Sequence, residues 1–228
     1  MQATAWILDR RHRARRIDAD VAPTERPLLA VKRATAAAGI ALEFGPLGVR
    51  DGAFLFLHTH PGDGDGWRSL ADWSRDEPAW RLYVDVMLGG WEPPTRELDV
   101  FFFGGGPPLA AKLAHMVVKG VKRGTTCWLA ASERDGSPIP RVGAISIVTD
   151  GFGYPLCAIR SEKVEQRRFR DIDAALAFAE GEGDRTLEDW RECHLAYFRE
   201  EAAQLGLRFD EDQQVLFEHF SLLAVLGR

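Results

Sequence analysis

The sequence predicts an α+β protein in which a small, closed or half-closed β-barrel is flanked by helices and preceded by an N-terminal α/β extension. Short apolar runs separated by glycine turns occupy the second half of the chain, and two helical segments interrupt them. This arrangement is typical of a barrel with helices packed outside it. With 228 residues, of which 46% are hydrophobic, the chain is long enough for one large or two smaller cores.

Residues 1–78 form the predicted extension. Its N-terminus is apolar and then basic. An alanine-rich segment that ends at Gly39 indicates a helix, and a short apolar run further along indicates a strand. The elements expected here are a helix at 28–38, a strand at 53–57 and helices at 69–73 and 77–88.

The second part, residues 79–228, contains the predicted barrel. Apolar residues at helical spacing predict a helix before Gly120, and Thr186-x-x-Asp189 has the pattern of a capping box that begins another. Glycines supply the turns between the strand-like runs. The expected elements are helices at 108–119, 173–180 and 186–206, with strands at 127–131, 144–148, 156–159 and 215–225.

Charge is unevenly distributed along the chain. The net charge of −5 argues against extensive non-specific binding of nucleic acid. Residues 112–170 contain 11 basic and 5 acidic residues, whereas residues 171–218 contain 4 basic and 14 acidic ones. These segments form either opposite walls of one cleft or two separate solvated faces, and the sequence leaves both interpretations open.

The cysteines and the apolar runs indicate where the protein resides. Cys127, Cys157 and Cys193 are widely spaced and form no CxxC pair, which is typical of reduced, buried thiols in the cytoplasm. No apolar run approaches the roughly 20 residues of a membrane span, and the N-terminus lacks the apolar core of a signal peptide. We therefore expect a cytoplasmic protein without a membrane partner.

The segment Gly120-x-Lys122-x-x-Thr125 joins a predicted helix to a predicted strand. A lysine in such a turn, with a hydroxyl three residues later, can hold an anionic or carbonyl oxygen beside a nucleophile. The same residues are also typical of an ordinary helix C-terminus. Further along, acids alternate with glycine in residues 179–184, either in an exposed loop or as a carboxylate presented to a site.

These motifs, taken in order, resemble the ASCH domain family over about residues 79–228. The matching segments are 120–125, 140–143, 153–157, 169–173, 179–184, 190–194 and 218–220. The resemblance implies a PUA-like β-barrel with a cleft between the barrel and its helices. Members of the family have been linked to RNA binding, to ribonuclease activity and to amide hydrolysis of acetylated cytidine. The implied partner is therefore RNA or a modified nucleoside, and no cofactor is implied.

The matching motifs also imply roles for individual residues. Lys122 would stabilise negative charge or lower a neighbour's pKa, Thr125 would be the nucleophile, and Glu182 would be the general base. Thr126 competes with Thr125 for its role, and Glu180 competes with Glu182. The candidate substrate contacts are Gly120, Arg123, Trp128 and Arg160. The alternative function is a non-catalytic RNA-binding module that uses the same cleft.

A second resemblance lies in the extension. His58-x-His60-Pro61 and the later Ser69-x-x-Asp72 are similar to the zinc motif of JAMM (MPN-type) metalloproteases. Histidines two apart on a strand share a face, and an aspartate can supply the third ligand around an open position. The implied zinc ligands are His58, His60 and Asp72. A metalloprotease-like unit fused to an RNA-binding domain is thus a third hypothesis, and a strand end that binds no metal is its alternative.

Overall fold

The computed structural model describes residues 1–42, 44–58 and 65–226, and it divides into two compact units. The first unit comprises Met1–Leu98, Phe152–Pro155 and the C-terminal Leu226, and the second comprises Asp99–Gly151 and Leu156–Val225. The structure contains both sheets and helices, so the α+β prediction is confirmed. The predicted boundary after residue 78 falls inside a helix of the first unit.

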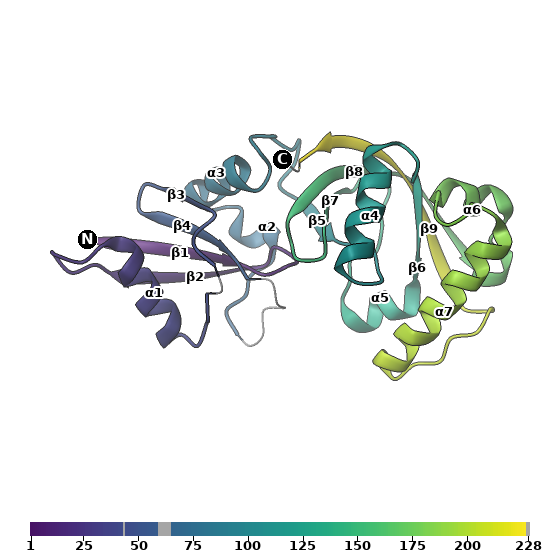
Figure 1. Ribbon diagram of the computed structural model, residues 1–228, viewed down its shortest axis with the longest axis horizontal. Coiled ribbons are helices and arrows are strands. Elements are labelled where there is room, and N and C mark those ends of the chain that lie inside the picture. Colours follow the sequence, from purple (N-terminus) through teal and green to yellow (C-terminus); the bar gives the residue numbers. More distant parts are fainter. Residues whose placement is uncertain (43, 59–64, 227–228) are drawn as a thin grey trace. The chain divides into compact units, whose positions relative to one another are not determined.

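Figure 1 shows the elements in chain order. The first unit contains β1 (Gln2–Leu8), β2 (Ala14–Asp20), α1 (Pro27–Ala37), β3 (Gly48–Arg50), β4 (Ala53–Leu57), α2 (Leu70–Trp73) and α3 (Glu77–Val86). The second unit begins at Asp99, inside β5 (Leu98–Phe101). Its other elements are α4 (Pro107–Val118), β6 (Gly124–Trp128), α5 (Leu129–Asp135), β7 (Ile145–Thr149), β8 (Pro155–Arg168), the 3₁₀ helix η1 (Phe169–Asp171), α6 (Ala174–Glu180), α7 (Leu187–Leu205) and β9 (Gln214–Val225).

The sheet of the first unit has the order β2-β1-β4-β3, with the central strands β1 and β4 parallel to each other. Because side chains alternate along a strand, β1 presents two apolar faces. Ala5 and Ile7 pack in the hydrophobic cluster that includes α1. Trp6 lies between them in the sequence and packs instead on Trp73 of α2, at 6.0 Å between ring centroids. Burial on both faces explains why β4 and the second half of β1 are apolar.

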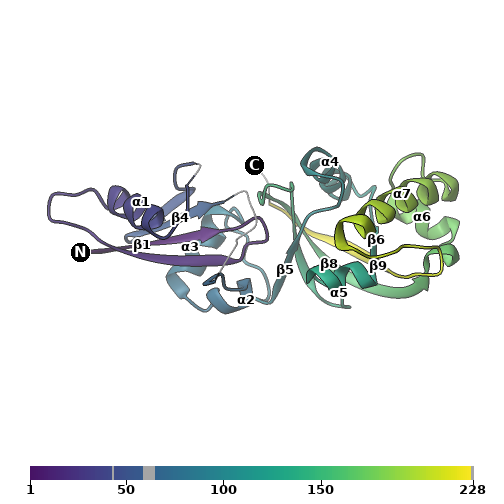
Figure 2. The ribbon, with the colours of Figure 1, turned by 90° about the horizontal axis from the view of Figure 1, so that it is seen from below.

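The sheet of the second unit has the order β5-β7-β8-β9-β6. Strands β8 and β9 are long antiparallel neighbours, which Figure 2 shows side by side. Their register shifts between Ala158 and Ile159 and again between Ser161 and Lys163. Such irregularities bend a strand and increase its twist, so they curve this sheet.

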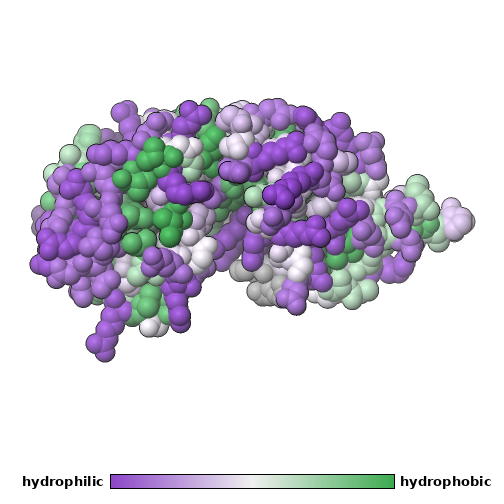
Figure 3. Space-filling view, turned by 180° about the vertical axis from the view of Figure 1, so that it is seen from behind, coloured by the Kyte–Doolittle hydropathy of each residue, from purple (hydrophilic) through white to green (hydrophobic). Residues whose placement is uncertain are grey.

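Helices cover two hydrophobic clusters of the second unit. α4 contributes to one cluster, and α5, α6 and α7 contribute to the other. The face seen in Figure 3 is largely hydrophilic, with hydrophobic side chains gathered in one area of this unit. The packed helices leave the ends of α4 and α6 near β6, where the candidate site lies.

Several predicted elements are confirmed, and others differ. The helices α1, α3, α4, α6 and α7 and the strands β4 and β7 lie within a few residues of their predicted positions. The predicted strand at 127–131 is correct only for Cys127 and Trp128, the last residues of β6, because the chain then leaves the sheet and continues as α5. The sequence patterns did not predict β1, β2 or β5. Among the described residues, no helix combines the length and the apolar character that a membrane span requires.

The zinc prediction concerns the end of β4. His58 directly follows this strand, and His60 lies outside the described residues. Asp72 lies in α2, where its carboxylate accepts a hydrogen bond of 2.6 Å from Ser69 Oγ. The described part of the chain contains no cluster of three metal-binding side chains. A zinc ion at His58, His60 and Asp72 therefore stays a prediction.

Candidate functional site

The predicted lysine lies just beyond the end of α4. Gly120 ends the helix with a φ of 69°, in the left-handed region that glycine adopts without strain. The Lys122 amide then donates a hydrogen bond of 3.2 Å to the carbonyl of Met116. This turn directs the chain into the unit, and the Lys122 side chain is fully buried.

The acidic segment after α6 lies against this turn. A Cβ atom on Gly181 would lie 2.4 Å from the Val121 carbonyl oxygen, so only glycine allows the two backbones to approach so closely. A hydrogen bond of 2.9 Å from the Arg123 amide to the Ala179 carbonyl joins the same segments. The acids on either side of Gly181 are thereby placed beside Lys122.

Lys122 forms ion pairs with both of these acids. Its Nζ atom contacts Glu182 Oε1 and lies 3.4 Å from Glu180 Oε2. The Nζ atom also lies 4.9 Å from the centroid of the Phe103 ring, within the range of a cation–π interaction. A buried ammonium is tolerated only when it is paired and hydrogen-bonded, and these three contacts meet that requirement.

Glu180 is the centre of a larger polar network. Its carboxylate accepts a hydrogen bond from Thr126 Oγ1 and lies 3.3 Å from His194 Nε2. Burial alone would raise the pKa of Glu180, but the charges of His194 and Lys122 hold it well below its usual range. Burial alone would lower the pKa of His194. The charge of Glu180 and its hydrogen bond outweigh the effect of burial, so the pKa of His194 is raised. The His194 ring stacks on Trp190 at 4.2 Å, which holds it in place.

The two predicted nucleophile candidates occupy successive positions of β6. The Thr126 hydroxyl is bound to Glu180. Among the described residues, no hydrogen bond engages the Thr125 hydroxyl, and Thr125 lines both cavities of the site. The competition left open by the sequence thus has a structural basis: Thr126 is anchored, and Thr125 is available.

The first cavity, of about 140 Å³, lies over the ion pairs, and we name it the ion-pair cavity. It is lined by Phe103, Gly104, Leu109, Leu113, Thr125, Thr126, Glu180, Glu182, Cys193, His194 and Tyr197. Lys122 is not among the described residues that line this cavity. Its two ion-pair partners, Glu180 and Glu182, line the cavity instead. Of the two predicted roles of Lys122, this geometry favours tuning a neighbour's pKa, which it does at Glu180.

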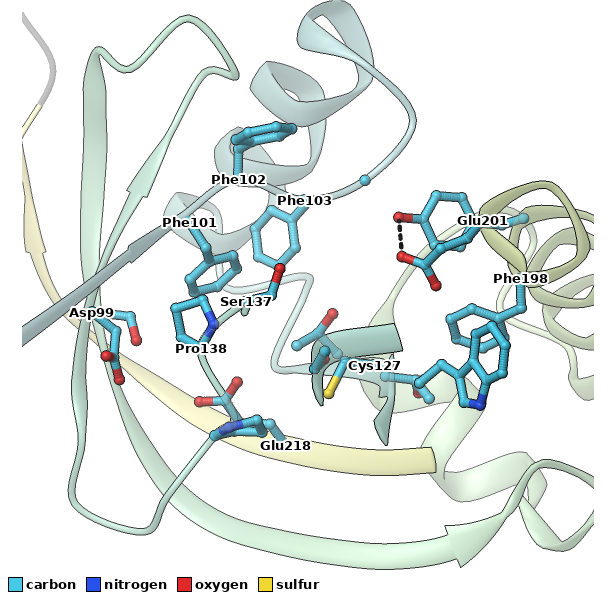
Figure 4. A pocket seen from close by; sticks show the side chains of 18 residues that line it. Asp99, Phe101, Phe102, Phe103, Cys127, Ser137, Pro138, Phe198, Glu201 and Glu218 are labelled. Atoms are coloured by element: carbon cyan, nitrogen blue, oxygen red, sulfur yellow. Dashed lines mark hydrogen bonds between the residues drawn. The ribbon is translucent and has the colours of Figure 1, made fainter. Parts of the chain in front are cut away.

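The second cavity, of about 180 Å³, shares Phe103, Gly104, Thr125, Thr126 and Tyr197 with the first. We name it the aromatic cavity. Its other lining residues are Asp99, Phe101, Phe102, Cys127, Trp128, Ser132, Ser137, Pro138, Pro140, Ser146, Phe198, Glu201 and Glu218. Figure 4 shows Phe101 and Phe103 on one side of it and Glu201 and Phe198 on the other.

The predicted substrate contacts are dispersed. Trp128 lines the aromatic cavity and is buried. Arg123 is exposed, and its Nε atom donates a hydrogen bond of 2.9 Å to the carbonyl of Gly120. Arg160 lies on β8, and it is not among the described residues that line either cavity. The structure therefore brings Trp128 to the site and leaves Gly120, Arg123 and Arg160 outside the two cavities.

Comparison with known proteins identifies the second unit. A family model for the ASCH domain matches residues 99–224, which is more than half of the chain. The chain belongs to the ASCH domain family. The matched range closely follows the second unit, so the family prediction is confirmed. No curated protein matches the chain.

Two solved structures are similar to the ASCH domain of this chain. One is the ASCH domain from Lactobacillus crispatus JV V101, with 27% identity and a TM-score of 0.55, covering 63% of this chain and 93% of that one. The other is protein EF3133 from Enterococcus faecalis V583, with 27% identity and a TM-score of 0.53, covering 65% of this chain and 87% of that one. The predicted PUA-like fold is thus confirmed, and it belongs to a class of folds that generally bind RNA.

Sequence reasoning missed three residues that the structure places in the site. His194 ends the matched segment 190–194, and its spacing from Trp190 was a usable signal, but no role was predicted for it. Glu201 and Glu218 are carboxyls of the aromatic cavity. Glu218 lies in the matched segment 218–220 but has no predicted role, and nothing in the local sequence distinguishes Glu201 from the other acids of its segment. The burial of both carboxyls depends on packing between distant elements.

Proposed function

We propose that the ASCH domain of this chain is a hydrolase that acts on RNA or on a modified nucleoside such as acetylated cytidine. The observation that carries the proposal is the ion-pair cavity, where an available hydroxyl (Thr125) and a carboxylate (Glu182) line one space. Lys122 lies beneath them and is bound to Glu182. This set of groups is a nucleophile, a base and a charge-tuning cation.

The reaction on an acylated exocyclic amine follows from these positions. The Thr125 hydroxyl oxygen attacks the acyl carbon, and Glu182 accepts the hydroxyl proton. The C–N bond then breaks, and Glu182 returns the proton to the departing amine. Water, activated by the same carboxylate, hydrolyses the acyl-threonine to release the acid and restore the hydroxyl.

The remaining polar groups support this chemistry without reacting. Lys122 and His194 keep Glu180 ionised, and Glu180 anchors the Thr126 hydroxyl next to Thr125. A preorganised network of this kind holds the reacting groups in place without the cost of reorganising solvent. Because Lys122 is buried, it acts on the substrate through the acids that line the cavity.

The proposal is tested with acetylated cytidine and with a short single-stranded RNA as substrates. Thr125→Val and Glu182→Gln should lower turnover by at least about 100-fold, the scale of a lost catalytic group. Glu188→Gln is the matched control, because Glu188 is an exposed acid at the start of α7. Circular dichroism of each variant checks that it has folded.

The second candidate function is a non-catalytic RNA-binding module, favoured by the general RNA-binding character of the fold. It predicts no turnover by the wild-type protein and weaker RNA binding in both variants. If the wild-type protein turns over neither substrate and binds RNA, the hydrolase proposal is wrong and this module is the better description.

A further inference from the structure

The aromatic cavity has features that the proposed hydrolysis does not use. Phe101 and Phe103 lie on one side, and Phe198 lies across from them (Figure 4). A volume of about 180 Å³ is below the roughly 300–1,000 Å³ of cavities that hold drug-sized ligands. Aromatic walls around so small a space suit one planar ring, because every base has a face that stacks on an aromatic side chain.

The charges of this cavity argue against a phosphate ligand. No lysine, arginine or histidine is found among the described residues that line it, whereas three acids are. Asp99 is paired with Arg141, at 3.4 Å between Oδ2 and Nη2. Glu218 accepts a hydrogen bond from Ser161, and burial raises the pKa of Glu218, which favours its neutral form. A neutral group that donates hydrogen bonds fits these walls better than an anion.

Glu201 is the acid that retains an unused acceptor. Its Oε1 atom accepts a hydrogen bond of 3.4 Å from the Tyr197 hydroxyl. Its Oε2 atom is buried and has no hydrogen-bond partner among the described residues. A buried acceptor without a partner is unfavourable, and a ligand with suitable donors would remove this cost.

We propose that the aromatic cavity is a base-binding subsite that selects a ring with two adjacent N–H donors, the edge that guanine presents through N1 and N2, and that the Glu201 carboxylate accepts both. An ionised carboxylate can accept two parallel hydrogen bonds, and such charge-assisted pairs are stronger than neutral ones. The inference rests on the proposed role in binding RNA or a nucleoside, but it does not depend on hydrolysis.

Binding of this edge has a defined pH dependence. Burial, followed by the charge of Asp135 on α5, raises the pKa of Glu201 to about 7, and the Tyr197 hydroxyl opposes that shift. The other titratable groups facing the cavity are Asp99, Glu218 and the thiol of Cys127, whose pKa burial raises to about 11. Because the ligand needs ionised Glu201, its affinity should rise about tenfold from pH 6 to pH 8.

Calorimetric titration of the full chain with free nucleosides tests the proposal. Guanosine should bind, and 1-methylguanosine, which lacks the N1 donor, should bind at least about tenfold more weakly, as should cytidine and uridine. Glu201→Gln should weaken guanosine binding by a similar factor and remove the rise with pH. Glu200→Gln, at the exposed neighbouring position, is the matched control and should bind like wild type.

Several results would overturn the inference. Equal binding of guanosine and 1-methylguanosine, or unchanged binding by Glu201→Gln, would remove Glu201 as the acceptor. Tighter binding of N-acetylarginine amide than of guanosine would identify a peptide subsite instead. Absence of binding by all four nucleosides would exclude a base-binding role. If Glu182→Gln abolishes turnover and keeps guanosine binding, the two sites are separable. If the wild type binds guanosine but shows no turnover, only the hydrolase proposal fails.

Discussion

Two histidines, the buried His12 of the first unit and the half-buried His194 of the second, meet opposite environments. His12 of the first unit contacts the Tyr83 hydroxyl and the Gly153 carbonyl, both at 2.7 Å. Because a carbonyl only accepts, Nε2 carries the proton, and Nδ1 accepts from Tyr83. Burial lowers the pKa of His12 to about 4, so it remains neutral. His194 of the ASCH domain contacts a carboxylate instead, and its pKa is raised.

The difference separates a structural polar group from one that belongs to the candidate site. His12 is satisfied by two neutral partners, and its contacts link the turn after β1, the helix α3 and the segment Phe152–Pro155 within the first unit. His194 is part of a cluster that keeps several charges buried beside a cavity. Buried charge is costly, so its retention near a cavity marks a functional site more strongly than burial of a histidine does.

The largest expected effect comes from breaking the charge cluster. Lys122→Met removes the cation that Glu180 and Glu182 share, leaves Glu180 with His194 alone, and should destabilise the ASCH domain by about 3–5 kcal/mol. Urea unfolding measures the change, and hydrogen exchange resolved by peptide locates it. Lys119→Met is the control, because Lys119 is exposed at the end of α4. Equal stability of the two variants would show that the ion pairs of Lys122 do not stabilise the ASCH domain.

The neutral histidine predicts sensitivity to acid in the first unit. Unfolded His12 binds a proton near pH 6.5, whereas the folded state does so only near pH 4. The unfolded state therefore holds more protons in this window, and stability should fall by about 3 kcal/mol as pH drops through it. Urea unfolding at pH 7 and 4.5 measures this loss.

His12→Asn is the matched variant for that measurement. The φ of His12 is 56°, and asparagine tolerates this left-handed region better than most residues. The variant should be less stable at pH 7 and less sensitive to acid. An equal loss on acidification in both proteins would show that His12 is not responsible.

The charged histidine predicts the opposite slope in the ASCH domain. Its raised pKa means that its stabilising contribution is complete below about pH 6.5 and is lost as pH rises through the folded pKa. His194→Gln should therefore cost about 2 kcal/mol at pH 5.5 and less at high pH. NMR titration of the ring protons should show His194 titrating above the usual range and His12 only near pH 4. A His194 that titrates below pH 6 would contradict the proposed pairing.

The smallest expected effect separates the two threonines of β6. Thr126→Val removes a hydrogen bond to Glu180 and should cost about 1–2 kcal/mol in urea unfolding. Thr125→Val should change stability by less than about 0.5 kcal/mol, because its hydroxyl is not engaged by the described residues. The reverse order would mean that Thr125 is the structural hydroxyl and Thr126 the available one.

Local patterns were sufficient for much of the fold. The capping box at Thr186 begins α7 as predicted, and its hydroxyl accepts a hydrogen bond of 3.2 Å from the Asp189 amide. β8 was predicted only as residues 156–159, because its later half is charged and lacks an apolar signal. That half is a strand because β9 supplies a continuous hydrogen-bonding partner. The end of β6 at Trp128 also depends on tertiary packing.

An ordered set of motifs was sufficient to predict the family, the general fold and an acidic turn that pairs with Lys122. The packing of the chain adds that Lys122 is buried and that Glu180 shares it with Glu182. Packing also makes Thr126 the anchored hydroxyl and leaves Glu201 Oε2 without a hydrogen-bond partner among the described residues. The physical reason is that burial and hydrogen-bond partners depend on which distant elements pack together, and sequence spacing records neither.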